Sequence, residues 1–512
     1  MSEKQGQFQR AITLFDAVMI VTGSMIGSGI FIVSADIARQ VGSSGWLLMV
    51  WLLTGVITLA GAISYGELAS MFPKVGGQYV YLREAYNKLV AFLYGWSLFL
   101  VIQTGVIAAV AVAFAKFTGV LVPWFSVKNI LFRAGPMQLP LVGEYTFEFS
   151  SVQLLAILLI IGITAINARG VRAGKLIQNV LGSTKLVALA LLILGGVTLG
   201  LNAEAVQANF QDMWTAVRFP APGASAAPLP LTLSGLVVAV GMAMTGSLFS
   251  SDSWNNIGFA GEEIVNPERT LVRSMAMGTA IVTALYILSN VVYLLVLPLA
   301  GSPDATTIAG RGIMYATDDR VATAVAEHVL GPAGAVVLAV LIMLSTFGAN
   351  NGIILSGARA YFAMAKDGLF FPGLARLNAA GVPSRALWAQ CLWASLLCLS
   401  GSYGQLLNYV MFSVILFYVI TIIGIFVLRR TRPTAPRPYR AWGYPVLPGL
   451  YVVLASAFCL ILLLAPDTAE FSRRGLLLVA LGVPVYFLFG KRFAGGSPAV
   501  PAEDEVQHHG RS

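Results

Sequence analysis

Two polar, glycine-rich stretches interrupt long apolar segments of this chain. The first reads Thr22-Gly23-Ser24-Met25-Ile26-Gly27-Ser28-Gly29, and the second reads Gly246-Ser247-Leu248-Phe249-Ser250-Ser251-Asp252-Ser253. Lipid offers no hydrogen-bond partner, so irregular backbone at membrane depth occurs only where it lines a cavity or is buried in protein. The free N–H and C=O groups of such a break can bind charged groups. The matched pair predicts a binding site formed between two broken helices.

At the first break, Gly27 and Gly29 permit torsions that other residues avoid and leave the backbone open to a ligand. If the helix unwinds here, the segment that follows starts with free N–H groups, whose partial positive charge suits a carboxylate. In the alternative interpretation, the small residues Gly23, Gly27 and Ser28 only let helices pack closely. The recurrence of a break in the second half of the chain favours binding.

Four serines and one aspartate crowd residues 247–253 at the second break. Unwound carbonyls here would carry partial negative charge and suit an ammonium group, so the two breaks together predict a receptor for a zwitterion. A carboxylate at the centre of a span is unfavourable by about 2.5–3.5 kcal/mol, so Asp252 is expected to face a wet cavity. It would act either as a substrate ligand or as a cap of the outgoing half-helix.

Lys185 is the second charge that the sequence places deep in a span. It lies about 12 Å beyond the expected helix start near residue 177, at 1.5 Å per residue. A buried lysine indicates a functional role, whereas a lysine that snorkels from a tilted helix end does not. Asn350 either lines the cavity or bonds a neighbouring helix. Glu67 and Lys116 are expected to be interfacial anchors because they fall near span ends.

Composition defines the elements that must position these residues. A mean hydropathy of +0.80, with 57% apolar and 11% charged residues, indicates a polytopic membrane protein of the all-α class. A hydropathy window of about 19 residues predicts twelve transmembrane helices. They are expected at residues 12–36, 45–70, 86–119, 152–168, 176–200, 232–259, 272–299, 331–364, 384–402, 407–430, 445–465 and 475–491.

The charges orient the chain in the membrane. The net charge is +9, and when loops are assigned alternately to the two sides, most of the 32 Lys and Arg residues fall on one side. The positive-inside rule then places both termini in the cytoplasm of a multi-pass protein of the cell (inner or plasma) membrane. The excess of basic residues is therefore explained by orientation in the membrane and by contact with anionic lipid headgroups. Nucleic acid is not an expected partner.

The breaks fall in the first and the sixth predicted helix, which suggests two units of five helices. A repeat with an odd number of helices must insert with inverted topology, the architecture that alternating access uses. The expected parts are a cytoplasmic tail (1–10), a first five-helix repeat (11–200), a second, inverted five-helix repeat (231–430), two added helices (444–492) and a disordered cytoplasmic tail (493–512).

Several motifs resemble the amino acid–polyamine–organocation superfamily, and within it the L-type amino-acid transporters. The resemblance runs over nearly all of residues 11–430 and implies a LeuT-type five-plus-five inverted repeat that transports L-amino acids. The motifs are Met25-Ile26-Gly27-Ser28-Gly29-Ile30-Phe31, Gly182 through Leu191, Trp254-Asn255 with Gly261-Glu262-Glu263 and Asn266-Pro267, and Phe347-Gly348-Ala349-Asn350-Asn351-Gly352.

The resemblance also implies roles for individual residues. Ser28 and Gly29 would meet the substrate carboxylate, and Phe249 would be a lid. Lys185 would replace the second sodium ion that sodium-coupled relatives bind between helices 1 and 8, with Asn350 as a further coupling or gating residue. Met25, Phe249, Ser250 and Asp252 would offer backbone groups around the amine. The expected substrate-binding residues are completed by Ile26, Gly27 and Ser251.

The chain departs from animal L-type transporters, which bond a heavy chain through a cysteine in the outer loop between helices 3 and 4. Residues 120–151 contain no cysteine, so no disulfide-linked heavy chain is expected. The sequence instead suggests a stand-alone, bacterial-type transporter. The three cysteines, Cys391, Cys398 and Cys459, fall in predicted spans, where small apolar packing is their expected role.

The sequence favours sodium-independent exchange of neutral amino acids. Proton-coupled symport and the transport of cationic amino acids or polyamines remain open. An enzyme would need paired acids, a histidine cluster or a Ser/Lys dyad at membrane depth, and His328, His508 and His509 are all expected in loops or the tail. A channel would need a repeated filter or charge ring. No catalytic residue, metal or cofactor is therefore predicted.

Overall fold

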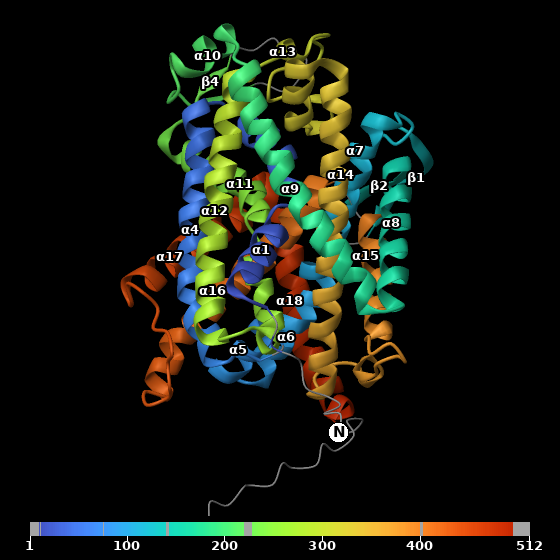
Figure 1. Cartoon of the computed structure of the whole chain (residues 1–512), viewed down its shortest axis with the longest axis vertical. Coiled ribbons are helices and arrows are strands. Elements are labelled where there is room, and N and C mark those ends of the chain that lie inside the picture. The colour runs from blue at the N-terminus through green and yellow to red at the C-terminus, as the bar shows by residue number, and fades with distance from the viewer. Residues whose placement is uncertain are drawn as a thin grey trace, which may run out of the picture.

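The structure is a computed structural model that describes residues 10, 12–74, 76–139, 143–219, 228–399 and 403–494. Most of the expected N-terminal tail (1–10) and C-terminal tail (493–512) lies outside these residues. Helices run along the long axis of the molecule and form one bundle (Figure 1). We call the end of the bundle at which α1 begins the N-terminal end; it lies at the bottom of Figure 1.

The elements, in chain order, are α1 (Leu14–Met25), α2 (Gly29–Ile32), α3 (Ser34–Val41), α4 (Ser44–Met71), α5 (Gln78–Ala85), α6 (Lys88–Ser97), the π-helical turn η1 (Leu98–Ile102), α7 (Gln103–Leu121), β1 (Ile130–Leu139), β2 (Gly143–Ser150), α8 (Ser151–Ala168), α9 (Val171–Leu199), α10 (Ala203–Phe210), β3 (Val217–Arg218), β4 (Leu229–Pro230), α11 (Leu233–Ser250), the 3₁₀ segment η2 (Trp254–Glu263), α12 (Pro267–Val296), α13 (Ile308–Arg311), η3 (Thr317–Asp319), α14 (Val321–Lys366), η4 (Pro372–Ala375), α15 (Ser384–Cys398), α16 (Tyr403–Thr431), α17 (Val446–Leu464) and α18 (Pro466–Ala494).

Nine helices among the described residues are long and apolar enough to cross a membrane. The count becomes ten if Lys185–Leu199 and Ala203–Phe210, which meet at 101°, form one bent span. The structure therefore confirms a multi-pass helical protein, but not the full count of twelve. The first predicted span is divided into α1, α2 and α3, and α15 has only 15 residues, fewer than the roughly 20 that a perpendicular crossing needs.

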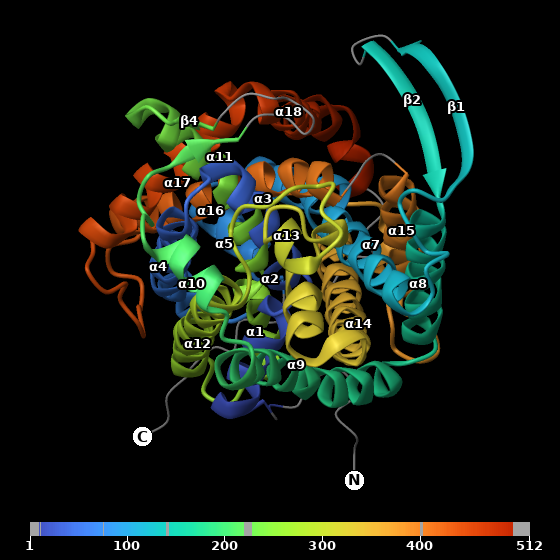
Figure 2. The same ribbon diagram turned by 90° about the horizontal axis from the view of Figure 1, so that it is seen from above.

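Two elements depart from the sequence prediction. The segment 120–151, expected as a loop, contains the antiparallel hairpin β1–β2, in which Ala134 pairs with Phe147 and which projects away from the helices (Figure 2). The eighth helix begins at Val321 and not near 331, with a sharp bend at Gly331, whose φ is +67°. His328 is therefore an exposed residue of α14, and its expected place in a loop was wrong.

Glu67 is not the interfacial anchor that the sequence suggested, because its side chain is only 1% exposed. Its carboxylate accepts hydrogen bonds from Arg429 at 3.0 and 2.6 Å and from the backbone N–H of Ala441 at 2.7 Å. Arg437 lies 3.3 Å away. Charges that are paired and hydrogen-bonded in this way are tolerated in the interior, and this cluster fastens the end of α4 to the segment between α16 and α17.

The π-helical turn η1 is stabilised by side chains that donate hydrogen bonds to its backbone carbonyls. A wide turn loses regular backbone partners, and here Thr104 donates to the carbonyl of Phe99 at 2.6 Å. Trp393 of α15 donates to the carbonyl of Leu100 at 2.8 Å, and Tyr361 of α14 to that of Leu98 at 3.3 Å. The turn is thereby fixed beside the second break, where Leu98 lines a pocket.

Candidate functional site

The first break separates α1 from α2. Ile26 closes α1 by donating its N–H to the carbonyl of Thr22 at 2.9 Å, and then turns to an extended conformation with φ −74° and ψ 90°. Ser28 precedes α2, whose first turn has no side-chain cap. Ser28 and Gly29 are buried. The predicted interruption of the first helix is confirmed, and the backbone groups around it face the interior of the bundle.

The second break separates α11 from η2. Ser251 donates its N–H to the carbonyl of Ser247 at 3.0 Å and ends the helix. Ser253 then adopts φ +70°, a left-handed conformation that is unfavourable for a residue other than glycine. The following segment, η2, is a 3₁₀ helix. The second predicted interruption is therefore also confirmed.

The two breaks meet in the structure. A Cβ atom placed on Gly29 would collide with the hydroxyl of Ser250 and lie 2.8 Å from the Cβ of Ser250. Gly29 therefore lacks a side chain because α2 packs directly on the end of α11, a reason that differs from the open backbone expected from the sequence. Gly27 is different, because the nearest atom to a Cβ there would be the carbonyl oxygen of Met25 at 4.0 Å.

Tyr286 of α12 bridges the two breaks. Its hydroxyl lies 3.0 Å from the carbonyl oxygen of Met25 and 3.0 Å from that of Ser250, so its single proton can be donated to either break. The side chain is only 1% exposed. A tyrosine hydroxyl in this position holds the last carbonyl of α1 beside the last carbonyl of α11.

Further polar residues of α12 continue this contact along one face of the helix. Tyr293 donates to the carbonyl of Ile30 at 3.1 Å, and Asn290 accepts from the hydroxyl of Ser34 at 2.7 Å. With Tyr286, these residues follow a spacing of four and three, which places them on one helical face. Sequence reasoning missed them, although a polar stripe on an otherwise apolar span was a visible signal.

Lys185 is buried, with 2% of its surface exposed, and its ammonium donates a hydrogen bond to the carbonyl of Gly23 in the last turn of α1. This contact contradicts the snorkelling interpretation and confirms the expected proximity of Lys185 to the first break. Among the described residues, Lys185 makes no hydrogen bond with Asn350 of α14, the further coupling residue expected from the resemblance. Within the described part of the chain, the polar side-chain atoms of Ser345 and Asn350 are buried without hydrogen-bond partners.

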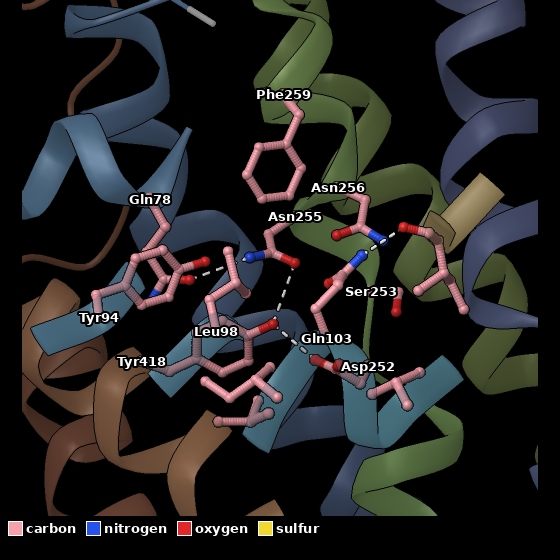
Figure 3. A pocket seen from close by; sticks show the side chains of 14 residues that line it. Gln78, Tyr94, Leu98, Gln103, Asp252, Ser253, Asn255, Asn256, Phe259 and Tyr418 are labelled. Carbon is pink, nitrogen blue, oxygen red and sulfur yellow. Dashed lines mark hydrogen bonds between the residues drawn. The ribbon is translucent and has the colours of Figure 1, made fainter. Parts of the chain in front are cut away.

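Asp252 lies in a pocket between η2, α5, α7 and α16. Tyr418 donates its hydroxyl to the carboxylate of Asp252 at 2.6 Å and lies 3.1 Å from the amide oxygen of Asn255. Asn255 donates to the amide oxygen of Gln78 at 3.2 Å, and Gln78 donates to Thr421 at 2.9 Å. Figure 3 shows the hydrogen bonds that lead from Gln78 through Asn255 and Tyr418 to Asp252, with Asp252 at one end of the pocket and the ring of Phe259 at the other.

The position of Asp252 supports both roles that the sequence left open. Its carboxylate also accepts a hydrogen bond from the backbone N–H of Ser253, as a cap would. It nevertheless lines the pocket, where a ligand could reach it. Phe249, the expected lid, is a buried residue in the last turn of α11. Neither Phe249 nor Asn350 is among the residues that line the pocket.

At the far end of the bundle, an ion pair joins α3 to the segment before α14. Arg39, near the end of α3, donates to the carboxylate of Asp319 at 2.8 Å and to the carbonyl of Met314 at 2.6 Å. Asp36 lies 3.6 Å from the same guanidinium. Because α3 continues the half-helix that follows the first break, this cluster fixes that half-helix to the segment before α14.

The N-terminal end is hollowed by a vestibule, which η2, α5 and the last turns of α14 border. Two ion pairs line it: Arg359 with Glu263 at 3.4 Å, and Arg83 with Asp367. Burial lowers the pKa of Arg83, but Asp367, Tyr79 and Glu84 together outweigh it and raise the pKa above its ordinary value. Tyr79 donates to Asp367 at 2.9 Å, and burial, then Asp367, raises the pKa of its phenol.

A bundle of membrane-length helices in which two broken helices meet defines a membrane protein of the transporter class. The chain belongs to the amino acid permease family, whose sequence model matches residues 12–486. This confirms the resemblance to amino-acid transporters of the L type and the expectation that the chain is not an enzyme.

Curated relatives cover nearly the whole chain. The b(0,+)-type amino acid transporter 1 of Mus musculus is 29% identical over 490 residues, which cover 95% of this chain and 89% of that protein. The large neutral amino acids transporter small subunit 2 of Rattus norvegicus is 31% identical over 482 residues, covering 94% and 80%. The human b(0,+)-type amino acid transporter 1 is 29% identical over 490 residues, covering 95% and 89%.

Proposed function

We propose that this protein moves L-amino acids across the cell membrane by alternating access, with the substrate held between the two helix breaks. The observation that carries the proposal is the meeting of the breaks, where Tyr286 contacts one carbonyl from each. Both kinds of relative are named as amino acid transporters. We expect the N-terminal end, and therefore the vestibule, on the cytoplasmic side, because the distribution of basic residues favours that orientation.

The chemistry of the site suits a zwitterion. Backbone N–H groups at Ser28 and Gly29, where α2 starts without a side-chain cap, would take the carboxylate. Carbonyls at the ends of α1 and α11, from Met25 and Ser250, would take the ammonium; Tyr286 satisfies only one of them at a time. In this proposal, residues 11–200 and 231–430 are the two inverted repeats, and α17 and α18 are additional helices.

We expect transport to be independent of sodium. Lys185 already places an ammonium on the carbonyl of Gly23, and a sodium ion beside it would meet like-charge repulsion. Replacing external sodium with choline should leave initial uptake rates unchanged, and uptake into vesicles should rise strongly when they are preloaded with an amino acid, as exchange requires. Uptake that needs sodium would contradict the assignment, and equal uptake into preloaded and empty vesicles would contradict exchange.

Neutral substrates are the favoured class, and cationic amino acids are the second candidate because Asp252 is a half-buried carboxylate that lines the pocket. Asp252→Asn keeps the shape of the side chain and removes its charge. If the carboxylate binds the cationic side chain of a substrate, the variant should lose arginine uptake while leucine uptake is retained. Equal losses for both substrates would indicate that Asp252 serves as the cap of the second break. Competition between arginine and leucine in reconstituted vesicles measures the difference.

We also propose that the protein acts without a disulfide-linked heavy chain. One of the relatives is named a small subunit, but residues 120–151 of this chain contain no cysteine. Its three cysteines are all buried, so they are not available to a partner.

A further inference from the structure

The segment between α16 and α17 is exposed, basic and aromatic. It projects outward from the bundle beside α4 (Figure 2). Trp442 is 71% exposed, and Arg440 and Val446 are exposed as well. Tryptophan and arginine at the end of a membrane-length helix are typical of the headgroup layer, where the ring lies at the apolar boundary and the cation reaches phosphate. This position suits contact with lipid.

Glu67 of α4 fixes the segment in this place. Its carboxylate accepts a hydrogen bond from the N–H of Ala441 at 2.7 Å and pairs with Arg429 and Arg437. The charges of these two guanidinium groups are therefore balanced within the protein. Arg440 differs from them, because it forms no ion pair within the described ranges of the chain. Its charge remains available to a ligand.

A second arginine ends an exposed stripe on α12. The apolar members of the stripe, Met277, Ile281 and Leu288, are each exposed, and with Arg273, which is also exposed, they follow the spacing of one helical face. An apolar face of this kind on a membrane-length helix lies against acyl chains. Arg273 stands at the N-terminal end of the stripe, where headgroups begin. Like Arg440, it forms no ion pair among the residues that the structure describes.

The segment crosses the end of α4 and reaches α12. A Cβ atom on Gly66 of α4 would lie 3.0 Å from Val272 of α12 and 3.3 Å from Tyr439 of the segment. The helix α17 packs on α4 at a different point, since a Cβ atom on Gly61 would lie 2.7 Å from Tyr451. The segment therefore runs from α17, across the end of α4, to the side on which α12 packs.

We propose that Arg273 and Arg440 together bind the phosphate of an anionic phospholipid. Each directly follows one of the two residues that meet at Gly66, so both cations lie at the same end of α4. Guanidinium groups without acidic partners match phosphate oxygens with parallel N–H donors. Trp442 lies beside them for the glycerol region, and the acyl chains follow the exposed face of α12. Basic sites between membrane helices bind such headgroups. The proposal does not rest on the transported substrate.

The test adds phosphatidylglycerol to the purified, delipidated full chain in a non-ionic detergent and measures bound lipid by native mass spectrometry. Phosphatidylcholine, which has no net charge, is the reference lipid. We expect the first phosphatidylglycerol to bind at least about tenfold more tightly than phosphatidylcholine, because each nearby arginine adds to the attraction. Arg273→Gln combined with Arg440→Gln should remove this preference. If the double variant does not fold, each single variant should reduce the preference.

Arg385→Gln is the matched control. Arg385 is an exposed arginine in the first turn of α15, on the opposite side of the bundle from α17 (Figure 2), and its loss should leave the preference unchanged. In bilayers, brominated phosphatidylglycerol should quench the fluorescence of the native protein more than that of Trp442→Phe. A double variant with the native lipid preference would overturn the proposal. Competition by inorganic phosphate at equal affinity would also overturn it, because the site would then bind phosphate and not lipid.

Discussion

Gly29→Val should abolish amino-acid uptake by separating the two broken helices. A Cβ atom at this position would collide with the hydroxyl of Ser250 and lie 3.1 Å from its Cα, and valine adds two methyl groups with little rotamer freedom. Overpacking of this kind costs about 1–3 kcal/mol. Because this clash lies where the proposed site binds both charges of the substrate, we expect the affinity for substrate to fall at least about tenfold. Substrate binding to the purified protein measures the loss.

The control for Gly29→Val is Gly162→Val in α8, where nothing lies within 4 Å of an added Cβ; it should bind and transport normally. A compensating pair identifies the cause more sharply. Ser250→Gly removes the atoms that meet the new side chain, so Gly29→Ala combined with Ser250→Gly should bind better than Gly29→Ala alone, and the interaction energy comes from the double-mutant cycle. Normal affinity of a correctly inserted Gly29→Val protein would place the substrate site elsewhere.

The breaks could be predicted from the sequence because their signal is local. Glycine, serine and aspartate within a few residues of an apolar span conflict with a continuous helix in lipid, and both interruptions fall where that conflict is strongest. The depth of Lys185 in its span was also visible in the sequence, but its place beside the first break was implied only by the family resemblance. In each case a short stretch of sequence contains the physical reason.

The partners of these residues could not be predicted in the same way. Tyr286 contacts Met25, 261 residues away, and Tyr418 contacts Asp252, 166 residues away; a hydroxyl in an apolar span does not reveal which carbonyl or carboxylate it will meet. The charge of Glu67 near a span end suggested an anchor in the headgroups, but its arginine partner lies 362 residues away. Packing between distant helices decides these contacts.

The contact of Gly29 with Ser250 gives this glycine a packing role that the sequence did not reveal. The sequence placed Gly29 in the binding site because glycine exposes backbone, and the structure shows that glycine is also required for the approach of α2 to α11. In the proposed site, two half-helices that end together must pack closely and still leave backbone groups for a ligand. Gly27 has open space around it, so close packing does not explain this glycine.

Lys185→Met should leave the fold intact and reduce transport strongly. The substitution keeps an unbranched side chain in the buried site and removes the ammonium that binds the carbonyl of Gly23. A hydrogen bond to a charged group contributes about 1.5–3 kcal/mol, which corresponds to roughly a 10- to 150-fold change in an equilibrium constant. The loss should appear in substrate affinity and in exchange rate, because α1 is no longer fixed to α9 beside the break.

Two further measurements separate the possible roles of the Lys185 charge. If the ammonium only positions α1, Lys185→Met should lower exchange equally at every imposed pH gradient. If it carries a proton during the cycle, the response of uptake to a pH gradient should disappear in the variant while the native protein shows one. Lys116→Met provides the control, since Lys116 lies in α7 towards the far end of the bundle, away from both breaks. A Lys185→Met protein with native rates and native pH response would show that the buried ammonium serves neither binding nor coupling, and that the contact with Gly23 only holds two helices together.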